Sequence, residues 1–195
     1  WFLTGTLIMT WLTYLVGYCF KSQREPLFFA NWIVMPTVLL FCVINIIIDW
    51  KKGQKPKKFS WKENFPQTFG EWIFVFLIVL LITQLMFWTF YIKEEKLGVG
   101  LSVFSDFSPH LGMIRSFSYG NNFPTQYAHF AGEDIRYHFM FQFLVGNLEY
   151  LGLRLDFAFN LPSIFSLIGT FLLLYVLAVK LTGTRMVGYL TALFF

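Results

Sequence analysis

The polar side chains that could do chemistry gather in one stretch of this chain, residues 102–138. The stretch holds all three histidines, together with Asp106, Arg115 and the acidic pair Glu133-Asp134. A carboxylate can act as a general base or bind a metal ion, and an arginine can bind phosphate through its planar fork of donors. We therefore treat this stretch as the candidate functional site.

Asp106 is the first candidate because it lies close to a predicted helix start. Ser108 and Pro109 form a typical N-cap followed by proline at the first helical position. They predict a helix from Pro109 to about Tyr119, which Gly120 would end. The positive end of the helix dipole would favour the charged carboxylate. Two interpretations stay open: Asp106 is a general base or metal ligand, or it only caps the helix.

Further candidates surround Asp106 in the stretch. His110 and Arg115 fall on the same predicted helix. Arg115 could hold a phosphate group or anchor the helix to lipid headgroups. Arg136, Tyr137 and His138 follow the acidic pair. The histidines lack the tight spacing of a zinc site.

The rest of the chain has the composition of a membrane protein. Of its 195 residues, 56% are hydrophobic and 13% are charged, whereas soluble domains have about 25% charged residues. The shortfall lies in long uncharged blocks, which predict transmembrane helices. We expect an all-α integral membrane protein with about five such helices, at residues 1–20, 27–48, 72–92, from 157 to 179, and from 187 onward.

A basic run at residues 51–64, with six lysines and one glutamate, sets the predicted orientation. Such a run can contact anionic lipid or nucleic acid. The positive-inside rule explains it more simply as a cytoplasmic loop. The loop at residues 93–156 is then extracytoplasmic, and no nucleic acid is expected as a partner.

Residues 135–152 are apolar enough to form another helix. His138, Gln142 and Glu149 would cluster on one face of it, at 100° per residue. Such a polar stripe suits a helix at the membrane interface or one facing an internal cavity, and a membrane crossing is the remaining alternative. We prefer the interfacial position, which gives the loop two interfacial helices.

The cysteines and the chain ends carry less information. Cys19 and Cys42 both fall in apolar blocks and are expected to be small apolar fillers rather than a disulfide. The sequence lacks an initiator methionine and ends within the apolar run TALFF. We therefore expect it to be part of a longer polytopic protein.

Four motifs resemble the GT-C superfamily of membrane glycosyltransferases: SDFSPHLGMIRSF, GNNFP, FAGEDIRYHF and LDFAFNLPS. The similarity covers roughly residues 70–195 and is nearest to an uncharacterised branch with a tyrosine-rich motif. It is more distant to protein O-mannosyltransferases and lipid A sugar transferases. It divides the chain into residues 1–68, with two helices and the basic loop, and a core at residues 69–195.

The resemblance implies an inverting transferase whose donor is a sugar on a polyprenyl phosphate. Asp106 would then be the catalytic base, and an arginine or a divalent metal ion would meet the leaving phosphate. This chain has Asp106-Phe107 where many transferases have a paired Asp-Glu, and it lacks the prolines of their His-Pro-Pro motif. The implied substrate-binding residues are His110, Arg115, Glu133, Arg136, Tyr137 and His138.

Two functions are therefore weighed. The first is sugar transfer to an envelope glycan, lipid or protein, on the outer side of a bacterial or archaeal plasma membrane. The second is a non-enzymatic lipid-glycan transporter or envelope-assembly protein whose loop only binds a lipid headgroup. Membrane lipids are expected partners in both cases. An ion channel has little support, because no predicted span carries a charge at its middle.

Overall fold

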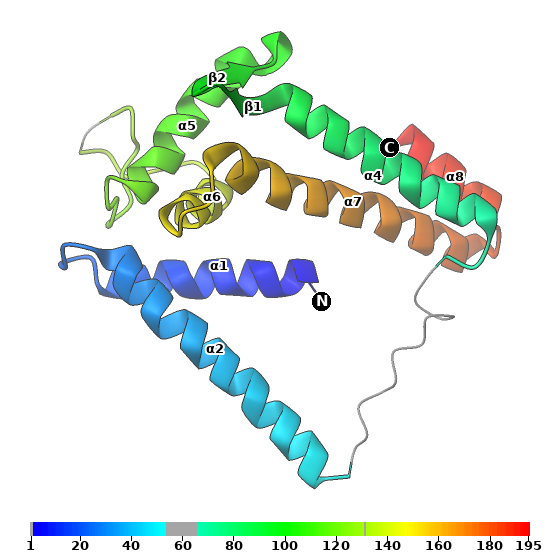
Figure 1. Ribbon diagram of the computed structural model, residues 1–195, viewed down its shortest axis with the longest axis horizontal. Coiled ribbons are helices and arrows are strands. Elements are labelled where there is room, and N and C mark those ends of the chain that lie inside the picture. Colours follow the sequence, from blue (N-terminus) through cyan, green and yellow to red (C-terminus); the bar gives the residue numbers. More distant parts are fainter. Residues whose placement is uncertain (1, 54–65, 131) are drawn as a thin grey trace. The chain divides into compact units, whose positions relative to one another are not determined.

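The computed structural model describes residues 2–53, 66–130 and 132–195 and is mainly helical. Four of its helices are long and apolar enough to cross a membrane (Figure 1). These helices match the first four predicted spans and indicate a membrane-embedded protein. Most of the lysine-rich run, residues 54–64, lies outside the described residues. The four helices are α1 Phe2–Cys19, α2 Pro26–Lys51, α4 Phe69–Thr89 and α7 Leu155–Thr182.

The sides of these helices are unusually apolar for surfaces in contact with water. Leu39 in α2, Leu81 in α4 and Leu173 in α7 are 69%, 64% and 66% exposed. With 18 to 28 residues each, the helices measure about 27–42 Å at 1.5 Å per residue. A hydrocarbon core is about 30 Å thick, so lipid can cover these exposed side chains.

Two shorter helices do not reach that length. α8, Arg185–Phe194, has 10 residues, or about 15 Å, and the fifth span stays a prediction. α6, Met140–Tyr150, has 11 residues, or about 16 Å. This length is too short for the membrane crossing that was one alternative for residues 135–152.

The chain divides into two compact units. The first unit comprises residues 1–59 and 104–154, and the second comprises residues 60–103 and 155–195. The predicted extracytoplasmic loop, residues 93–156, is therefore shared between the two units. All candidate site residues belong to the first unit.

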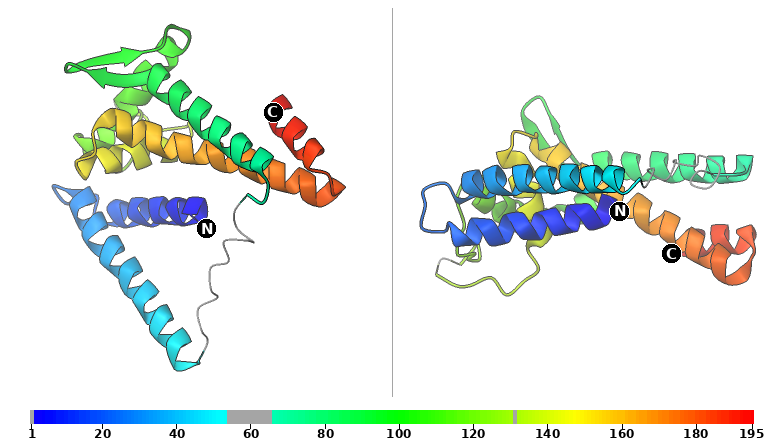
Figure 2. Two further views of the ribbon diagram at one scale, coloured as in Figure 1. Left: turned by 45° about the vertical axis from the view of Figure 1, so that its right-hand side comes forward. Right: turned by 90° about the horizontal axis from the view of Figure 1, so that it is seen from below.

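The second unit combines three helices with a β-hairpin. α4 packs on α7, and α7 and α8 form a helical hairpin (Figure 2). Strands β1, Phe90–Lys93, and β2, Lys96–Val99, pair antiparallel. Two buried side chains at the start of α7 hold β1. Asp156 Oδ2 accepts a hydrogen bond from the N–H of Ile92 (3.1 Å), and Asn160 Nδ2 donates to the carbonyl of Phe90 (2.7 Å).

One carboxylate connects the three helices of the second unit. Glu71 forms a capping box with Thr68 at the start of α4, which stabilises that helix end. Its Oε1 also accepts a hydrogen bond from the hydroxyl of Tyr175 in α7 (2.8 Å) and pairs with Nε of Arg185 in α8 (3.2 Å). Glu71 thus ties all three helix ends together.

The turn of the β-hairpin holds two glutamates in a backbone conformation that glutamate rarely adopts. Glu94 and Glu95 both have left-handed φ angles, 51° and 61°, which cost roughly 1–2 kcal/mol each outside glycine and asparagine. We expect Glu94→Asn with Glu95→Gly, the usual residues of this turn, to recover about 1 kcal/mol of this cost, because glycine loses more conformational entropy on folding. Hydrogen exchange of the strand amides should then slow by about five- to tenfold. The control is Glu94→Gln with Glu95→Gln, which removes the charge and keeps the strain. Equal slowing in that control would attribute the effect to charge.

The first unit is built around an aromatic core between α5, Phe104–Ser118, and α6. The two helices approach closely at Gly146, where a Cβ would lie 2.7 Å from the carbonyl oxygen of Ile114. Burial raises the pKa of the Tyr150 phenol beside this core, and the Glu25 carboxylate raises it further. The buried cluster consists of Leu27, Met113, Phe117, Phe123 and Phe143.

α5 begins earlier than the sequence predicts, so Ser108 is not its N-cap. A 3-10 turn, η1 Leu101–Val103, leads directly into the helix at Phe104. Pro109 is then the sixth helical residue, where its ring removes only the hydrogen bond to the carbonyl of residue 105. Ser105 is exposed, so water can satisfy that carbonyl. Asp106 lies within the first helical turn rather than ahead of it.

α6 begins later than the predicted start at Ile135. The preceding residues pair with the loop instead: Gln126 and Asp134 form an antiparallel bridge, and the N–H of Ile135 donates to the carbonyl of Thr125 (3.5 Å). His138 therefore lies before the helix. α7, in contrast, begins at Leu155, two residues before the predicted start of its span at residue 157.

Candidate functional site

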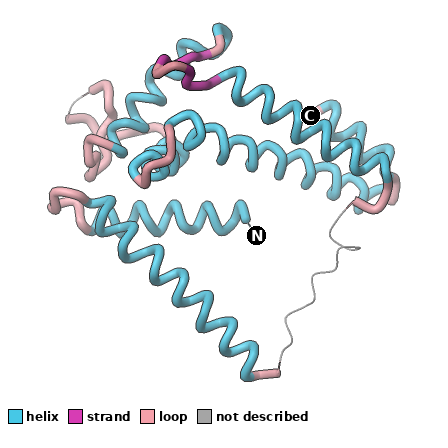
Figure 3. The backbone as a smooth tube through the Cα atoms, viewed as in Figure 1, coloured by secondary structure: helices cyan, strands magenta, loops and turns pink. Residues whose placement is uncertain are grey.

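The segment between α5 and α6, drawn as loop in Figure 3, is organised by its own polar side chains. Asn122 is the main organiser. Its Oδ1 accepts from the N–H of Gln126 (2.8 Å), and its Nδ2 donates to the carbonyl of Gln126 (2.8 Å) and to Oγ of Ser116 (2.9 Å). These bonds fold the segment back on the end of α5.

Two further hydrogen bonds hold this segment against α1 and the loop that joins α1 to α2. The hydroxyls of Thr125 and Tyr14 lie 2.8 Å apart, and Nδ2 of Asn121 donates to the carbonyl of Arg24 (2.8 Å). The ring of Tyr14 also packs on Phe123, with centroids 5.6 Å apart. The site-bearing segment is thus attached to the membrane helices of the first unit.

Four of the predicted site residues line one pocket of about 160 Å³. Asp106 and His110 come from α5, whereas Tyr137 and His138 come from the segment before α6. We call this space the His110 pocket. Its other lining residues are Pro109, Met113, Tyr127, Ile135 and Gln142.

Gln142 orients His110 in this pocket. The side chain of Gln142 is buried, and Nδ1 of His110 lies 2.7 Å from its amide. With the amide oxygen toward the ring, it accepts from Nδ1, and the amide nitrogen donates to the carbonyls of His138 and Phe139 at 3.3 Å. In this arrangement the amide oxygen faces a donor and the amide nitrogen faces acceptors, and the proton of the neutral His110 ring is assigned to Nδ1. Nε2 of His110 is then the acceptor.

The Asp106 carboxylate is available for chemistry. The residue is exposed, and its side chain forms no hydrogen bond or ion pair with any other residue that the structure describes. Asp106 lies inside the first turn of α5 and does not precede the helix as an N-cap, and its role as a general base stays a prediction.

A second pocket adjoins the first. It has a volume of about 310 Å³ and contains Glu133, Asp134 and Arg136. Tyr127 and Tyr137 line both pockets. We call it the Arg136 pocket. It places two carboxylates and one guanidinium next to the space that holds Asp106.

Arg115 lies outside both pockets. Its Nε pairs with Oε1 of Glu149 (3.0 Å), whose other oxygen accepts a hydrogen bond from the hydroxyl of Ser118 (2.7 Å). The guanidinium also lies over the ring of Tyr119, 5.0 Å from its centroid. The polar stripe of α6 thus faces α5: Gln142 contacts His110 and Glu149 contacts Arg115.

Two lining residues with polar side chains, Gln142 and Tyr127, were missed in the sequence. Gln142 had a signal, since it lies four residues after His138 on the predicted polar stripe, but the pattern did not identify its partner. Tyr127 had none, because only the folded loop brings it beside residues 106–110 and 135–138. The third histidine, His129, contacts the carbonyl oxygen of Pro109 through Nε2 (3.3 Å).

Other features of the described residues add little to this site. Within residues 2–53, 66–130 and 132–195, no group of three or more His, Cys, Asp or Glu side chains is arranged to hold a metal ion. Cys19 and Cys42 are free thiols.

Comparison with protein-family models, curated proteins and solved structures found no match to this chain.

Proposed function

We propose that the protein is a membrane glycosyltransferase of the GT-C type. It moves a sugar from a polyprenyl-phosphate donor to an envelope acceptor. In this proposal the candidate site faces the extracytoplasmic side of a bacterial or archaeal plasma membrane, in a multi-pass protein with about five spans. The acceptor is a glycan, a lipid or a protein of the envelope.

The observation that carries the proposal is the His110 pocket. Four of the residues that the sequence predicts for the site line this one space: Asp106, His110, Tyr137 and His138. The segment that forms it lies in the chain between two candidate membrane spans, α4 and α7. The protein must bind a donor with a polyprenyl tail close to the bilayer surface, because the tail stays in the hydrocarbon core.

The proposed step is an inverting displacement at the anomeric carbon. The Asp106 carboxylate takes the proton of the acceptor hydroxyl, and the acceptor oxygen forms a bond to the sugar. The bond between the sugar and the phosphate oxygen breaks, and polyprenyl phosphate leaves with the electron pair. Arg136, in the adjoining pocket, is the cation that would stabilise the leaving phosphate. His110, Tyr137 and His138 would bind the sugar hydroxyls.

The test of the proposal uses the full-length protein in lipid nanodiscs with labelled polyprenyl-phosphate sugars. We expect transfer by wild type, and Arg136→Ala should weaken donor binding about tenfold, as for loss of one charge-assisted hydrogen bond of about 1.5 kcal/mol. Lys93→Ala is the matched control, since it removes an exposed positive charge outside both pockets.

The possible results separate the two functions. Donor binding that depends on Arg136, without transfer from any sugar, would favour the carrier over the enzyme. Neither binding nor transfer by wild type would contradict both. Equal weakening by Lys93→Ala would mean that net charge, rather than the Arg136 pocket, attracts the donor.

A further inference from the structure

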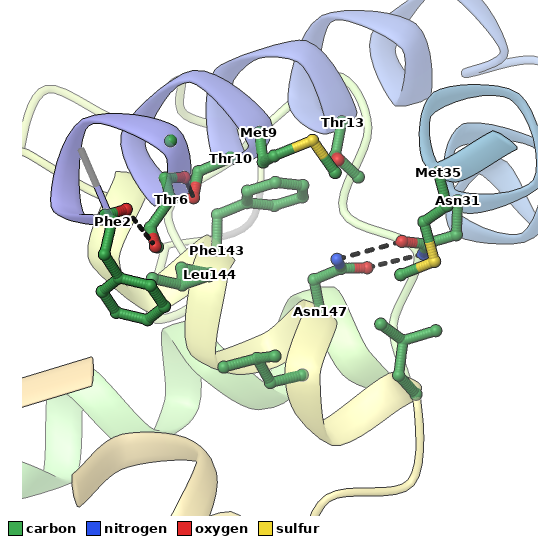
Figure 4. Close-up of a pocket in the computed structure, with 13 residues that line it drawn as sticks. Phe2, Thr6, Met9, Thr10, Thr13, Asn31, Met35, Phe143, Leu144 and Asn147 are labelled. Atoms are coloured by element: carbon green, nitrogen blue, oxygen red, sulfur yellow. Dashed lines mark hydrogen bonds between the residues drawn. The ribbon is translucent and has the colours of Figure 1, made fainter. Parts of the chain in front are cut away.

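A groove separate from the two site pockets lies between α1, α2 and α6 in the first unit. α1 and α2 meet at the loop of residues 20–25 and diverge from it (Figure 1). The groove has a volume of about 420 Å³ and is open on one side. Figure 4 shows side chains of all three helices around it, among them Met9, Met35 and Phe143.

The polar groups of this groove are largely satisfied by one another. Asn31 and Asn147 exchange two hydrogen bonds, Nδ2 to Oδ1 in each direction, at 2.7 and 3.1 Å (Figure 4). The hydroxyls of Thr6 and Thr10 donate to the carbonyls of Phe2 and Thr6, one turn earlier in α1. A polar ligand would have few free partners here, so the groove is suited to hydrocarbon.

The surroundings of the groove supply that hydrocarbon. Two of its three walls, α1 and α2, are candidate membrane spans whose outer side chains are exposed and apolar. An unfilled apolar volume loses dispersion contacts on all its walls, and water would find few partners in it. Lipid chains are therefore the adjacent material that can fill the groove.

The size of the groove favours a flexible chain over a helix. A helix with its side chains is about 10–12 Å across. A lipid chain is thinner and bends to an irregular wall. Two walls carry methionine, Met9 and Met35, whose flexible, polarisable side chains adapt to such a ligand.

We propose that an acyl chain of a bilayer phospholipid occupies this groove as a bound lipid. The Asn31–Asn147 pair joins α2 to α6 at one wall, and the chain fills the space that the diverging α1 and α2 leave open. This binding site lies outside the two site pockets and does not depend on sugar transfer. Its failure would leave the proposed enzyme function untouched.

Substitution of Gly5 can fill the groove without a steric clash at the Cβ atom. It lines the space, and a Cβ built on it meets no atom within 4 Å. Gly5→Trp therefore adds a ring to the groove without a clash at its first carbon, and it removes a glycine from a helix. Leu7→Trp is the matched control, because Leu7 is exposed on the same helix and does not line the groove. Met35→Trp fills the groove from α2.

The experiment is photocrosslinking of the full-length protein. The protein is placed in nanodiscs of phosphatidylglycerol and phosphatidylethanolamine with a trace of a phospholipid that carries a diazirine on its acyl chain. Labelled residues are located by mass spectrometry. We expect label at Met9, Leu144 and Leu148, which line the groove and are only partly exposed, to exceed label at exposed Leu39 several-fold. Gly5→Trp and Met35→Trp should each abolish that excess, whereas Leu7→Trp should retain it, and Leu39 should be labelled in every variant.

Three results would overturn the proposal. Uniform labelling of the groove and Leu39 would mean ordinary contact with the bilayer. Absence of label in the groove would mean that another protein segment fills it. Displacement of the label by trace polyprenyl phosphate, but not by excess phospholipid, would assign the groove to the polyprenyl chain.

Discussion

Replacing Asp106 by asparagine is expected to lower sugar transfer by about 10²–10⁴-fold, the usual contribution of a general base, while donor binding stays close to wild type. Asparagine has nearly the same shape and cannot take the acceptor proton. The carboxylate is exposed and unpaired among the described residues, so its loss should change stability by less than about 0.5 kcal/mol. The measurement is initial transfer rate and donor affinity in nanodiscs.

The neighbouring carboxylates provide the control for this prediction. Glu133→Gln and Asp134→Asn remove charge from the Arg136 pocket and leave Asp106 in place. We expect each to keep transfer within about tenfold of wild type, since neither group is the proposed base. A larger loss in Glu133→Gln than in Asp106→Asn would move the base to the adjoining pocket. Wild-type rates in Asp106→Asn would remove it from the mechanism.

Replacing Arg115 by methionine is expected to destabilise the first unit by about 3 kcal/mol, because it leaves a buried carboxylate without its cation. The two partners are unequal: the side chain of Arg115 is 50% exposed, whereas that of Glu149 is 6% exposed. Arg115 can be solvated when its partner is lost, but Glu149 cannot. We would follow urea unfolding in detergent micelles.

A double-mutant cycle tests this origin of the effect. Arg115→Met with Glu149→Leu should be more stable than Arg115→Met alone, because no buried charge remains. Glu149→Gln should cost less than Arg115→Met, since it can keep the hydrogen bond with Ser118. If Arg115→Met unfolds like wild type but binds donor weakly, Arg115 is a phosphate ligand, as the sequence first suggested, and the structural role is wrong.

The first four spans could be predicted because their signal is local. About 20 consecutive apolar residues are enough to identify a membrane helix, and α2 and α4 contain such runs. The ends of elements were less certain. The hairpin at Phe90–Val99 was missed because its turn residues, Glu94 and Glu95, are not those that normally adopt left-handed backbone. Hydrogen bonds with the side chains of Asp156 and Asn160, far along the chain, hold β1 against the start of α7.

The candidate site shows the same division. Residue types, together with the resemblance to the GT-C superfamily, predicted Asp106, His110, Tyr137 and His138 as site residues, because carboxylates, imidazoles and phenols perform acid–base and binding chemistry. Their placement in one pocket depends on Asn122 and on the bridge between Gln126 and Asp134, contacts that no periodicity predicts. The same sequence logic selected Arg115, which the fold places against Glu149 instead.

By itself, the sequence determined that this is a helical membrane protein, and which residues could do chemistry, since hydrophobicity and side-chain chemistry belong to each residue separately. The tertiary structure decided which of these residues meet. It placed Asp106 and His138 in the lining of one pocket, paired Arg115 with Glu149, and left an apolar groove between α1, α2 and α6. Such pairings arise from long-range packing, in which each contact depends on many others along the chain.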